Sequence, residues 1–368
     1  EPPEGDRSRR RGPFPGVPDP SQSGLFTHLN LNKRSVIIDF SEPSDTARMH
    51  ELLAEADLLV HDLPPDAADL VGLHEDDLAR RHPSLVTVSV TPFGRTGPYS
   101  KWCAEDLQLI HGGGWGWMTP GCSDEIDLPP LKPAGQQAGF QIGFAAATIA
   151  LGALDRSLCT GEGEHLDLSG MAYISSMLEA GFISWSYLNE IPGRAGTRIL
   201  NPWRIFEVAD GRIFIVCVED DQWARLKEVM GSPEWAQMEI FDTQAGRFDA
   251  EDLLHMWLGE WAAPQRVMDL FHLGQGNRIG FAPVNTIEQM LEDPHLRERG
   301  FLVEVDQPGL GTITLPGPVA RLAKSWWSVR EPAPALGEHQ DATFVEPRTA
   351  DQLVEQSRSR PLEGVTVA

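Results

Sequence analysis

Two glutamines flanked by glycines stand just before a long apolar stretch of the chain. The segment runs Gly135, Gln136, Gln137, Ala138, Gly139, and the residues that follow are rich in alanine and typical of a helix. The N-terminus of a helix offers unpaired backbone N–H groups and the positive end of a dipole, which stabilise negative charge developing on an oxygen atom. A carboxamide is a poor nucleophile because its nitrogen lone pair is delocalised. The segment therefore has surroundings suited to a developing negative charge, and it contains no carboxylate.

Carboxylates that could supply a nucleophile lie elsewhere in the sequence. Glu105 and Asp106 occur in the stretch AEDL, and Asp124, Glu125 and Asp127 occur in the acidic stretch SDEIDLPP. An ionised carboxylate can attack a carbonyl carbon and form a covalent intermediate. Glu105 fits equally well with a solvated or ion-paired surface residue. A further interpretation is that the two glutamines bind a substrate carboxylate as hydrogen-bond donors.

The charge balance of the chain is strongly acidic. The 368 residues include 54 acidic and 30 basic side chains, which gives a formal net charge of -24. This excess disfavours nucleic acid and anionic membranes as partners, because both would repel the protein. An anionic ligand would need a local basic patch. Two candidate patches are present, namely Arg7, Arg9, Arg10 and Arg11, and the pair Lys33 and Arg34.

No pattern in the sequence indicates a metal or a redox cofactor. The four cysteines are scattered without a CxxC pair, which argues against a zinc site or a disulfide framework and favours a cytoplasmic location. Neither a P-loop nor a GxGxxG fingerprint is present, so nucleotide and NAD chemistry have no support. The opening EPPEGD does not resemble a signal peptide. The apolar stretch 138–154 is predicted to be a buried helix rather than a membrane span, since it is rich in Ala and Gly.

Short apolar runs predict an α/β fold for the first half of the chain. The runs at 36–40, 57–62 and 84–90 are typical of buried strands, and the segments between them have helical spacing. This alternation of strand and helix implies a parallel sheet. Another strand is predicted at 165–169, followed by a helix over 171–188.

The second half of the chain has a different composition. A Pro/Gly-rich linker precedes a predicted β-hairpin at 205–218 with its turn at Asp210 and Gly211, and helices rich in Trp and Leu follow. The predicted parts are a large domain over 1–190, a small α+β domain over 203–305, a return to the large domain over 306–345, and a linker over 346–368.

Several stretches of the sequence form an ordered set that spans most of the chain. They include EPPEGD, LNLNKRSVIIDF, SLVTVSVTPFGRTGPYS, TGEGEHLDLS and APVNTIEQMLEDPHLRERGF. Together they resemble the family III CoA-transferases (CaiB/BaiF family), which include formyl-CoA and carnitine CoA-transferases and the α-methylacyl-CoA racemases. The resemblance implies a Rossmann-like large domain with a parallel sheet, built from both chain ends, plus the smaller α+β domain. It also implies an intertwined homodimer of two ring-like subunits.

Both ends of the sequence depart from the family pattern. The family's usual first strand is absent before EPPEGD, and the stretch RPLEGVTVA at 360–368 resembles that strand. This arrangement predicts one copy from a two-copy chain, in which residues 362–368 open the second copy. Circular permutation is the alternative.

The resemblance implies a reaction that passes through an enzyme carboxylate. An aspartate attacks the acyl-CoA thioester to give a mixed anhydride and CoA thiolate, the thiolate forms an aspartyl-CoA thioester, and the acceptor acid completes the exchange. The family's aspartate lies just before the Ala/Gly-rich helix, where this chain has Gln136 and Gln137. This copy is therefore predicted to have lost the nucleophile, with a second copy supplying it. Glu105 or Asp106 as a substitute carboxylate is an alternative.

The resemblance also implies where CoA binds. Asn32, Lys33, Arg34 and Asp39 match the family's CoA-binding positions. Residues 61–64 read His-Asp-Leu-Pro where the family favours Glu-Asn-Phe, and an added acid near a polyphosphate is expected to weaken binding.

The stretch AEDL separates two activities within the family. The transferases have a glutamate in this stretch and the racemases a histidine, so Glu105 favours transfer over racemisation. The prediction is a CoA-transferase that moves CoA from an acyl-CoA thioester to a carboxylic acid, with CoA or acyl-CoA as substrate and no metal. The alternative is a catalytically silent structural half of a two-copy CoA-transferase.

Overall fold

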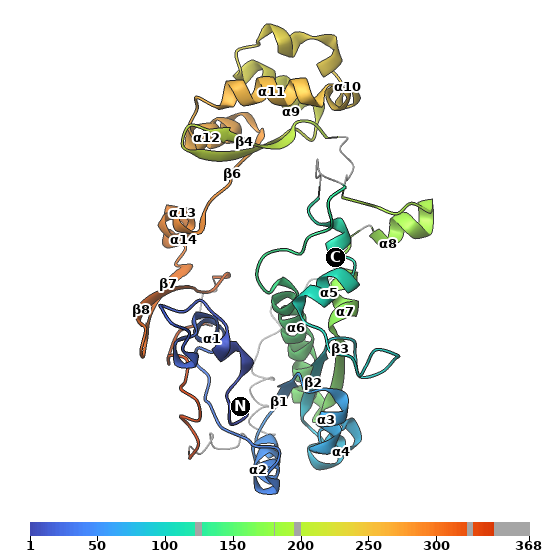
Figure 1. The fold of residues 1–368 in the computed structure, drawn as a ribbon, viewed down its shortest axis with the longest axis vertical. Coiled ribbons are helices and arrows are strands. Elements are labelled where there is room, and N and C mark those ends of the chain that lie inside the picture. The colour runs from blue at the N-terminus through green and yellow to red at the C-terminus, as the bar shows by residue number, and fades with distance from the viewer. Residues whose placement is uncertain (122–126, 180, 195–199, 322–326, 342–368) are drawn as a thin grey trace.

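A parallel sheet of three strands forms the centre of the large part of the molecule (Figure 1). The computed structural model describes residues 1–121, 127–179, 181–194, 200–321 and 327–341. The strands β1 (Leu58–His61), β2 (Val86–Thr91) and β3 (Glu164–Ser169) lie in the order β1-β2-β3, and both pairs are parallel. This arrangement confirms the α/β prediction and the strands predicted at 57–62, 84–90 and 165–169.

Helices cover both faces of this sheet, because successive side chains of a strand point to opposite faces. On one face, Val88 packs against Ala146 and Ala150 of the long helix α6. On the other face, Leu59 packs against residues of three helices, among them Leu53 of α2 (Pro43–Ala54). The other two helices are α3 (Pro65–Leu70) and α4 (Glu75–Arg81).

The strand predicted at 36–40 does not form, and the sheet consists of the other three predicted strands. The backbone N–H groups of this segment bond outside any strand ladder. Ile38 N donates to the carbonyl of Glu1 at 2.8 Å, and Ile37 N donates to Gln340 Oε1 at 2.8 Å. The apolar run is therefore held by a side chain from the far end of the chain, which no local pattern reveals.

Helix α6 (Gln137–Thr160) is buried on one face only. Small residues such as Ala146 and Ala150 let it approach the sheet closely, whereas the side chains of Phe144 and Leu151 are 70% and 66% exposed. The predicted burial therefore holds for the inner face of the helix and not for the outer face. Among the described residues, α6 is the one helix long and apolar enough to cross a membrane, a test that core helices also pass.

The helix predicted over 171–188 is interrupted. It forms as α7 (Gly170–Ser176), then α8 (Gly181–Ile183) and the π-helical turn η4 (Ser184–Leu188). The remaining short elements of the large part are α1 (Gly24–Leu29), α5 (Asp106–Gly112), η1 (Arg7–Arg10), η2 (Pro20–Gln22) and η3 (Gly116–Met118).

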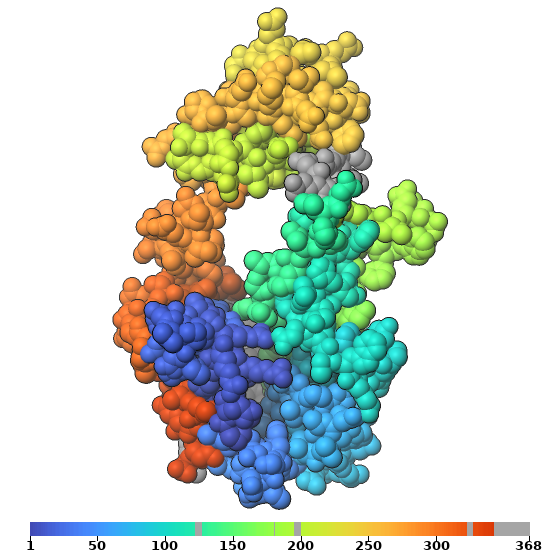
Figure 2. Space-filling model, in the orientation of Figure 1, coloured from blue at the N-terminus to red at the C-terminus, as the bar shows by residue number. Residues whose placement is uncertain are grey.

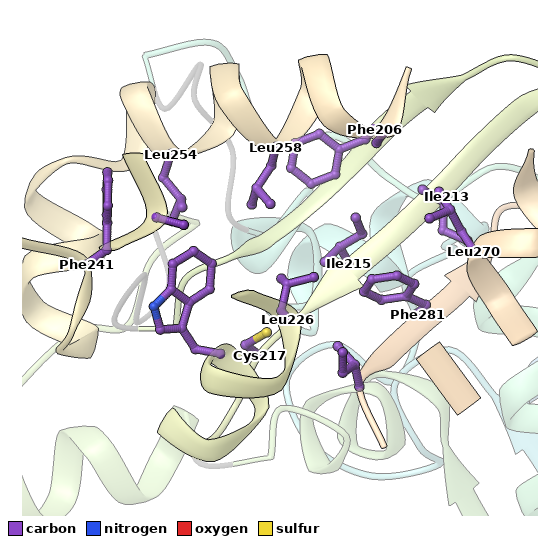
Figure 3. Packing of buried hydrophobic residues seen from close by; sticks show 14 of the residues in the cluster. Phe206, Ile213, Ile215, Cys217, Leu226, Phe241, Leu254, Leu258, Leu270 and Phe281 are labelled. Carbon is purple, nitrogen blue, oxygen red and sulfur yellow. The ribbon is translucent and has the colours of Figure 1, made fainter. Parts of the chain in front are cut away.

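A separate core lies in the small α+β part of the chain (Figure 3). Strands β4 (Trp203–Val208) and β5 (Gly211–Val216) form the predicted hairpin, with the two-residue loop at Ala209 and Asp210. Strand β6 (Gly280–Pro283) joins β5 antiparallel. The covering helices are α9 (Asp220–Val229), α10 (Gln244–Asp249), α11 (Glu251–Ala262) and α12 (Val267–Asn277), with η5 (Glu234–Gln237) and η6 (Glu239–Phe241).

The chain then returns to its N-terminal region. Helices α13 (Ile287–Glu292) and α14 (Pro294–Glu298) lead into the hairpin of β7 (Leu302–Gln307) and β8 (Gly311–Pro316), so the predicted boundary at 305 falls within β7. His339 N donates to the carbonyl of Ser35 at 2.9 Å. The predicted linker at 346–368 and the proposed start of a second copy lie outside the described residues.

Figure 2 shows an opening through the middle of the molecule. The small α+β part closes it on one side, the segment that carries α13 and α14 lies along a second side, and the region of α5 lies along a third. The described part of the chain therefore has the form of an open ring.

Two histidines lie on the sheet face that α3 and α4 cover. His61 is on β1 and His165 on β3, and the ring nitrogens of both are buried without a hydrogen-bond partner among the described residues. Burial, together with the nearby His165 and Arg95, lowers the pKa of His61 to about 4. His61 is therefore neutral in the folded protein at neutral pH.

We expect acid to destabilise the fold through His61. The unfolded chain binds a proton near pH 6.5 and the folded chain only near pH 4, so this contribution is complete above pH 6.5 and is lost as the pH falls towards 4. The loss is expected to be roughly 1–3 kcal/mol, and His61→Asn should remove it. Urea unfolding at pH 7 and pH 5 tests this, with the exposed His272→Asn as control. An equal acid sensitivity in wild type and His61→Asn would contradict it.

Candidate functional site

The N-terminus of α6 is capped by a carboxylate from a different helix. Asp106, the first residue of α5, accepts hydrogen bonds at Oδ1 from the backbone N–H groups of Ala138 at 2.7 Å and Gly139 at 3.3 Å. Its Oδ2 lies 3.0 Å from Lys132 Nζ, and the residue is 8% exposed. A negative charge at this end of a helix is stabilising. Oδ1 thus holds the N-terminus of α6, whereas Oδ2 is buried beside Lys132 in an ion pair and makes no hydrogen bond among the described residues. Asp106 could attack a substrate only by leaving these contacts.

The loop before α6 is fixed by its backbone. Lys132 Nζ donates to the carbonyls of Pro133 at 2.9 Å and Gly135 at 2.5 Å. Gly135 has a φ of 76°, in the left-handed region that favours glycine. Gln137 Nε2 donates to the carbonyl of Ala134 at 3.2 Å, so this amide closes the loop on itself.

Arg11 joins two of the predicted site residues. Its Nη1 donates to Gln136 Oε1 at 2.9 Å, and its Nη2 donates to Glu105 Oε2 at 2.9 Å. Glu105 and Gln136 lie 94 and 125 residues from Arg11 along the chain. A guanidinium can only donate, so the carbonyl oxygen of Gln136 must face Arg11 and its amide nitrogen must face away. The structure therefore brings Glu105, Gln136 and Asp106 to one end of α6.

Only part of the predicted arginine patch faces this site. Arg7 Nη1 lies 3.9 Å from Glu105 Oε1. Arg9 instead forms a buried ion pair with Glu1 at 2.7 Å and lies over the ring of Phe26. Arg10 donates to the carbonyl of Glu4 at 3.1 Å. The sequence placed all four arginines together, whereas the structure directs Arg7 and Arg11 to Glu105.

The predicted CoA-binding residues mostly hold the chain's own backbone. Asn32 has a φ of 62°, and its side chain donates to the carbonyl of Ser328 at 2.8 Å and accepts from the N–H of Arg330 at 2.7 Å. Lys33 Nζ donates to Asn30 Oδ1 at 3.0 Å. These contacts join the turn at 30–33 to the C-terminal segment. A role in binding CoA stays a prediction for Asn32 and Lys33.

Asp39 closes a short turn of its own. Its Oδ1 accepts from the Oγ and N–H of Ser41 at 2.6 and 2.9 Å, and these bonds lower the pKa of its carboxyl group. Arg34 is exposed beside Lys33. CoA binding by Arg34 and Asp39 likewise stays a prediction.

The structure gives none of the other candidate carboxylates a contact with this site among the described residues. Asp124 and Glu125 fall outside the described residues, and Asp127 is exposed. No group of His, Cys, Asp or Glu in the described part of the chain has the arrangement of a metal site.

A hollow between α13 and the β7–β8 hairpin would repel a polyphosphate, because three glutamates and one arginine line it: Glu288, Glu292, Glu304 and Arg297.

Sequence reasoning missed the contacts that organise the site. Arg11 was visible only as one of four clustered arginines, and Lys132 had no distinguishing pattern. The glycine at 135 was a usable signal, since a glycine before a helix often marks a positive φ. Contacts between residues so distant along the chain have no local signature.

The fold defines an α/β protein like those of the solved CaiB/BaiF structures. A CAIB/BAIF family protein from Brucella suis superposes with a TM-score of 0.81 at 26% identity, over 92% of this chain and 88% of that one. Residues 1–340 match CoA-transferase family III. The chain belongs to this family and is a CoA-transferase family III enzyme.

Characterised relatives match almost the full chain. Succinate–glutarate CoA-transferase of Agrobacterium fabrum is 27% identical over 355 residues, 95% of this chain and 87% of the relative. Succinyl-CoA:mesaconate CoA-transferase of Haloarcula hispanica is 28% identical over 92% of this chain and 86% of its own length. The succinyl-CoA:(R)-benzylsuccinate CoA-transferase subunit BbsE of Thauera aromatica is 29% identical over 94% and 86%. These matches give no support to the predicted two-copy chain.

Proposed function

We propose that this chain takes part in moving CoA from an acyl-CoA thioester, with succinyl-CoA as the model donor, to a dicarboxylic acid. We further propose that the nucleophilic carboxylate comes from a second chain of the same fold. The observation that carries this proposal is the end of α6, where residues 135–139 contain no carboxylate and Asp106 is bound by two backbone N–H groups and Lys132. The relatives named above, which act on succinyl-CoA or succinate, support the substrate class.

The chemistry begins with an ionised carboxylate on the enzyme. A carboxylate attacks the thioester carbonyl, the C–S bond breaks, and the CoA thiolate leaves behind a mixed anhydride. The thiolate then attacks the enzyme carbonyl of the anhydride and releases the donor acid as a carboxylate. The acceptor carboxylate reverses both steps, which yields its CoA thioester and restores the enzyme carboxylate. The amide side chains of Gln136 and Gln137 can hold a substrate by hydrogen bonds during these steps, but they cannot act as the nucleophile.

Four observations support a partner chain. The outer face of α6 exposes Phe140 and Phe144. The arm of α8 and η4 projects from the body (Figure 1) and exposes Phe182, Trp185 and Tyr187. Exposed apolar surface of this extent is typical of interaction sites. The opening in Figure 2 suits an intertwined pair, and some relatives, such as the BbsE protein, are named as subunits. A homodimer and a pair of different family members both fit these observations. We also propose a cytoplasmic location.

A second candidate is that Glu105 of this chain is the nucleophile. Its carboxylate side chain is 59% exposed, and Arg11 connects it to Gln136 at the end of α6. Asp106 caps the N-terminus of α6. Among the described residues, Glu105 caps only its own helix α5 and otherwise pairs with arginine.

Trapping separates the two candidates. The purified chain is incubated with succinyl-CoA and then with hydroxylamine, which converts an enzyme anhydride or thioester to a hydroxamate that peptide mass spectrometry locates. We expect no hydroxamate on this chain alone, because it supplies no nucleophile. A hydroxamate on Glu105 that disappears in Glu105→Gln would overturn the partner proposal in favour of the second candidate.

A further inference from the structure

Arg11 holds a carboxylate beside the end of α6, and that carboxylate belongs to the protein itself. Its guanidinium lies 2.9 Å from Glu105 Oε2, with the Arg11 side chain 38% exposed and the Glu105 side chain 59% exposed. Exposed ion pairs of this kind contribute little to stability, typically about 0–1 kcal/mol. The pair can therefore open at small cost, and a carboxylate from solution can reach the same guanidinium.

The hydrogen bond to Gln136 sets a second donor next to Arg11. Because Gln136 Oε1 accepts from Arg11, its Nε2 amide group is left as a pair of N–H donors that make no hydrogen bond among the described residues. Gln136 is half-buried, so these donors are partly shielded from water. An arginine fork next to an amide donor matches the two oxygens of a carboxylate.

The local charge also favours an anion. The groups at this end of α6 are three cations, Arg7, Arg11 and Lys132, and two carboxylates, Glu105 and Asp106. The chain as a whole carries a formal charge of -24. The site is thus a positive spot on an acidic protein, which attracts a small anion to this place.

We propose that Arg11 and the Gln136 amide bind a carboxylate of the dicarboxylic acid substrate, with Glu105 occupying Arg11 when the acid is absent. The proposal rests on the proposed CoA transfer for the identity of the acid. It gives Gln136 a function that needs no nucleophile, and it makes Arg11 a specificity-determining residue. Lys132 has a different task, since it holds Asp106 and the loop before α6.

Succinate binding to the purified chain, measured by isothermal titration calorimetry, tests the site without any turnover. We expect Arg11→Gln to raise the Kd for succinate at least tenfold and Gln136→Leu to raise it several-fold. Arg10→Gln is the matched control, because Arg10 bonds to the carbonyl of Glu4 and not to the site. We expect Glu105→Gln to tighten succinate binding, since it removes the competing carboxylate. A purely structural role for the Arg11–Glu105 pair would instead weaken binding in both variants.

Further measurements distinguish the ligand and the two proposals. Inorganic phosphate and CoA are titrated in parallel, and a loss confined to phosphate and CoA in Arg11→Gln would overturn the carboxylate assignment. Unchanged succinate affinity in Arg11→Gln, in a chain that supports CoA transfer with its partner, would also overturn it and leave the proposed function standing. Succinate binding that depends on Arg11 supports the site even where no CoA moves, and in that case the proposed function fails alone.

Discussion

The Gly139→Asp variant is expected to acquire a covalent adduct with succinyl-CoA that the wild-type chain lacks. The five residues of the loop and first turn offer unequal places for a carboxylate. Gly135 has a positive φ that strains any side chain, and Ala138 is fully buried. A Cβ atom added at Gly139 meets no atom within 4 Å. An aspartate at Gly139 would therefore stand free in the first turn of α6, where the helix dipole favours its ionised form.

In Gly139→Asp we expect the fraction of labelled protein to rise from background to a measurable value. Hydroxylamine trapping after incubation with succinyl-CoA, followed by peptide mass spectrometry, should place the hydroxamate on residue 139. Gly139→Asn is the matched control, because it has nearly the same size and no nucleophilic oxygen. Gln136→Asp and Gln137→Asp are expected to label less, since the first would pair with Arg11 and the second lies beside the Ala134 carbonyl. If no variant is labelled while CoA still binds, the end of α6 is not the place where a carboxylate acts.

The local elements of this fold follow largely from the sequence. The β-branched runs at 57–62 and 84–90 form β1 and β2, and the Asp-Gly pair marks the hairpin of β4 and β5 within one residue. These segments carry a local signal: β1 and β2 are short apolar runs typical of a sheet covered on both faces, and an Asp-Gly pair is typical of a hairpin turn. The run at 36–40 has the same pattern but lies beside Glu1 and Gln340 instead of a strand. The composition of this run is that of a strand, but the segments beside it are not strands.

The site was harder to predict than the fold. The glycines and the two glutamines indicated the end of α6, and AEDL indicated the carboxylates. Which carboxylate caps the helix and which stays exposed depends on a one-residue step, since Glu105 precedes α5 and Asp106 begins it. That step turns Asp106 towards α6 and Glu105 towards Arg11. Sequence spacing cannot distinguish two adjacent acids whose directions are set by a tertiary contact.

Replacing Arg247 with methionine is expected to destabilise the small α+β part by about 3–5 kcal/mol. The side chain of Arg247 is completely buried. Its Nε and Nη1 donate to the carbonyls of Asn201 and Phe241, both at 2.8 Å, and its Nη2 donates to Asp220 Oδ1 at 2.6 Å. Methionine fills a similar volume but removes the arginine's hydrogen bonds to these two carbonyl oxygens, and losing a hydrogen bond to a buried acceptor costs about 1–3 kcal/mol.

Urea unfolding followed by tryptophan fluorescence measures this loss of stability, because Trp223 lies in the same core. The guanidinium carbon of Arg247 lies over the Trp223 ring, 5.4 Å from the ring centre. Arg212→Met is the matched control. Its ion pair with Glu207 is largely exposed, so its loss should stay within about 1 kcal/mol. Arg247→Lys should fall between the two, since one ammonium group cannot reach all three acceptors. A loss in Arg247→Met no larger than in Arg212→Met would show that the backbone carbonyls find other donors. The buried arginine would then contribute packing alone.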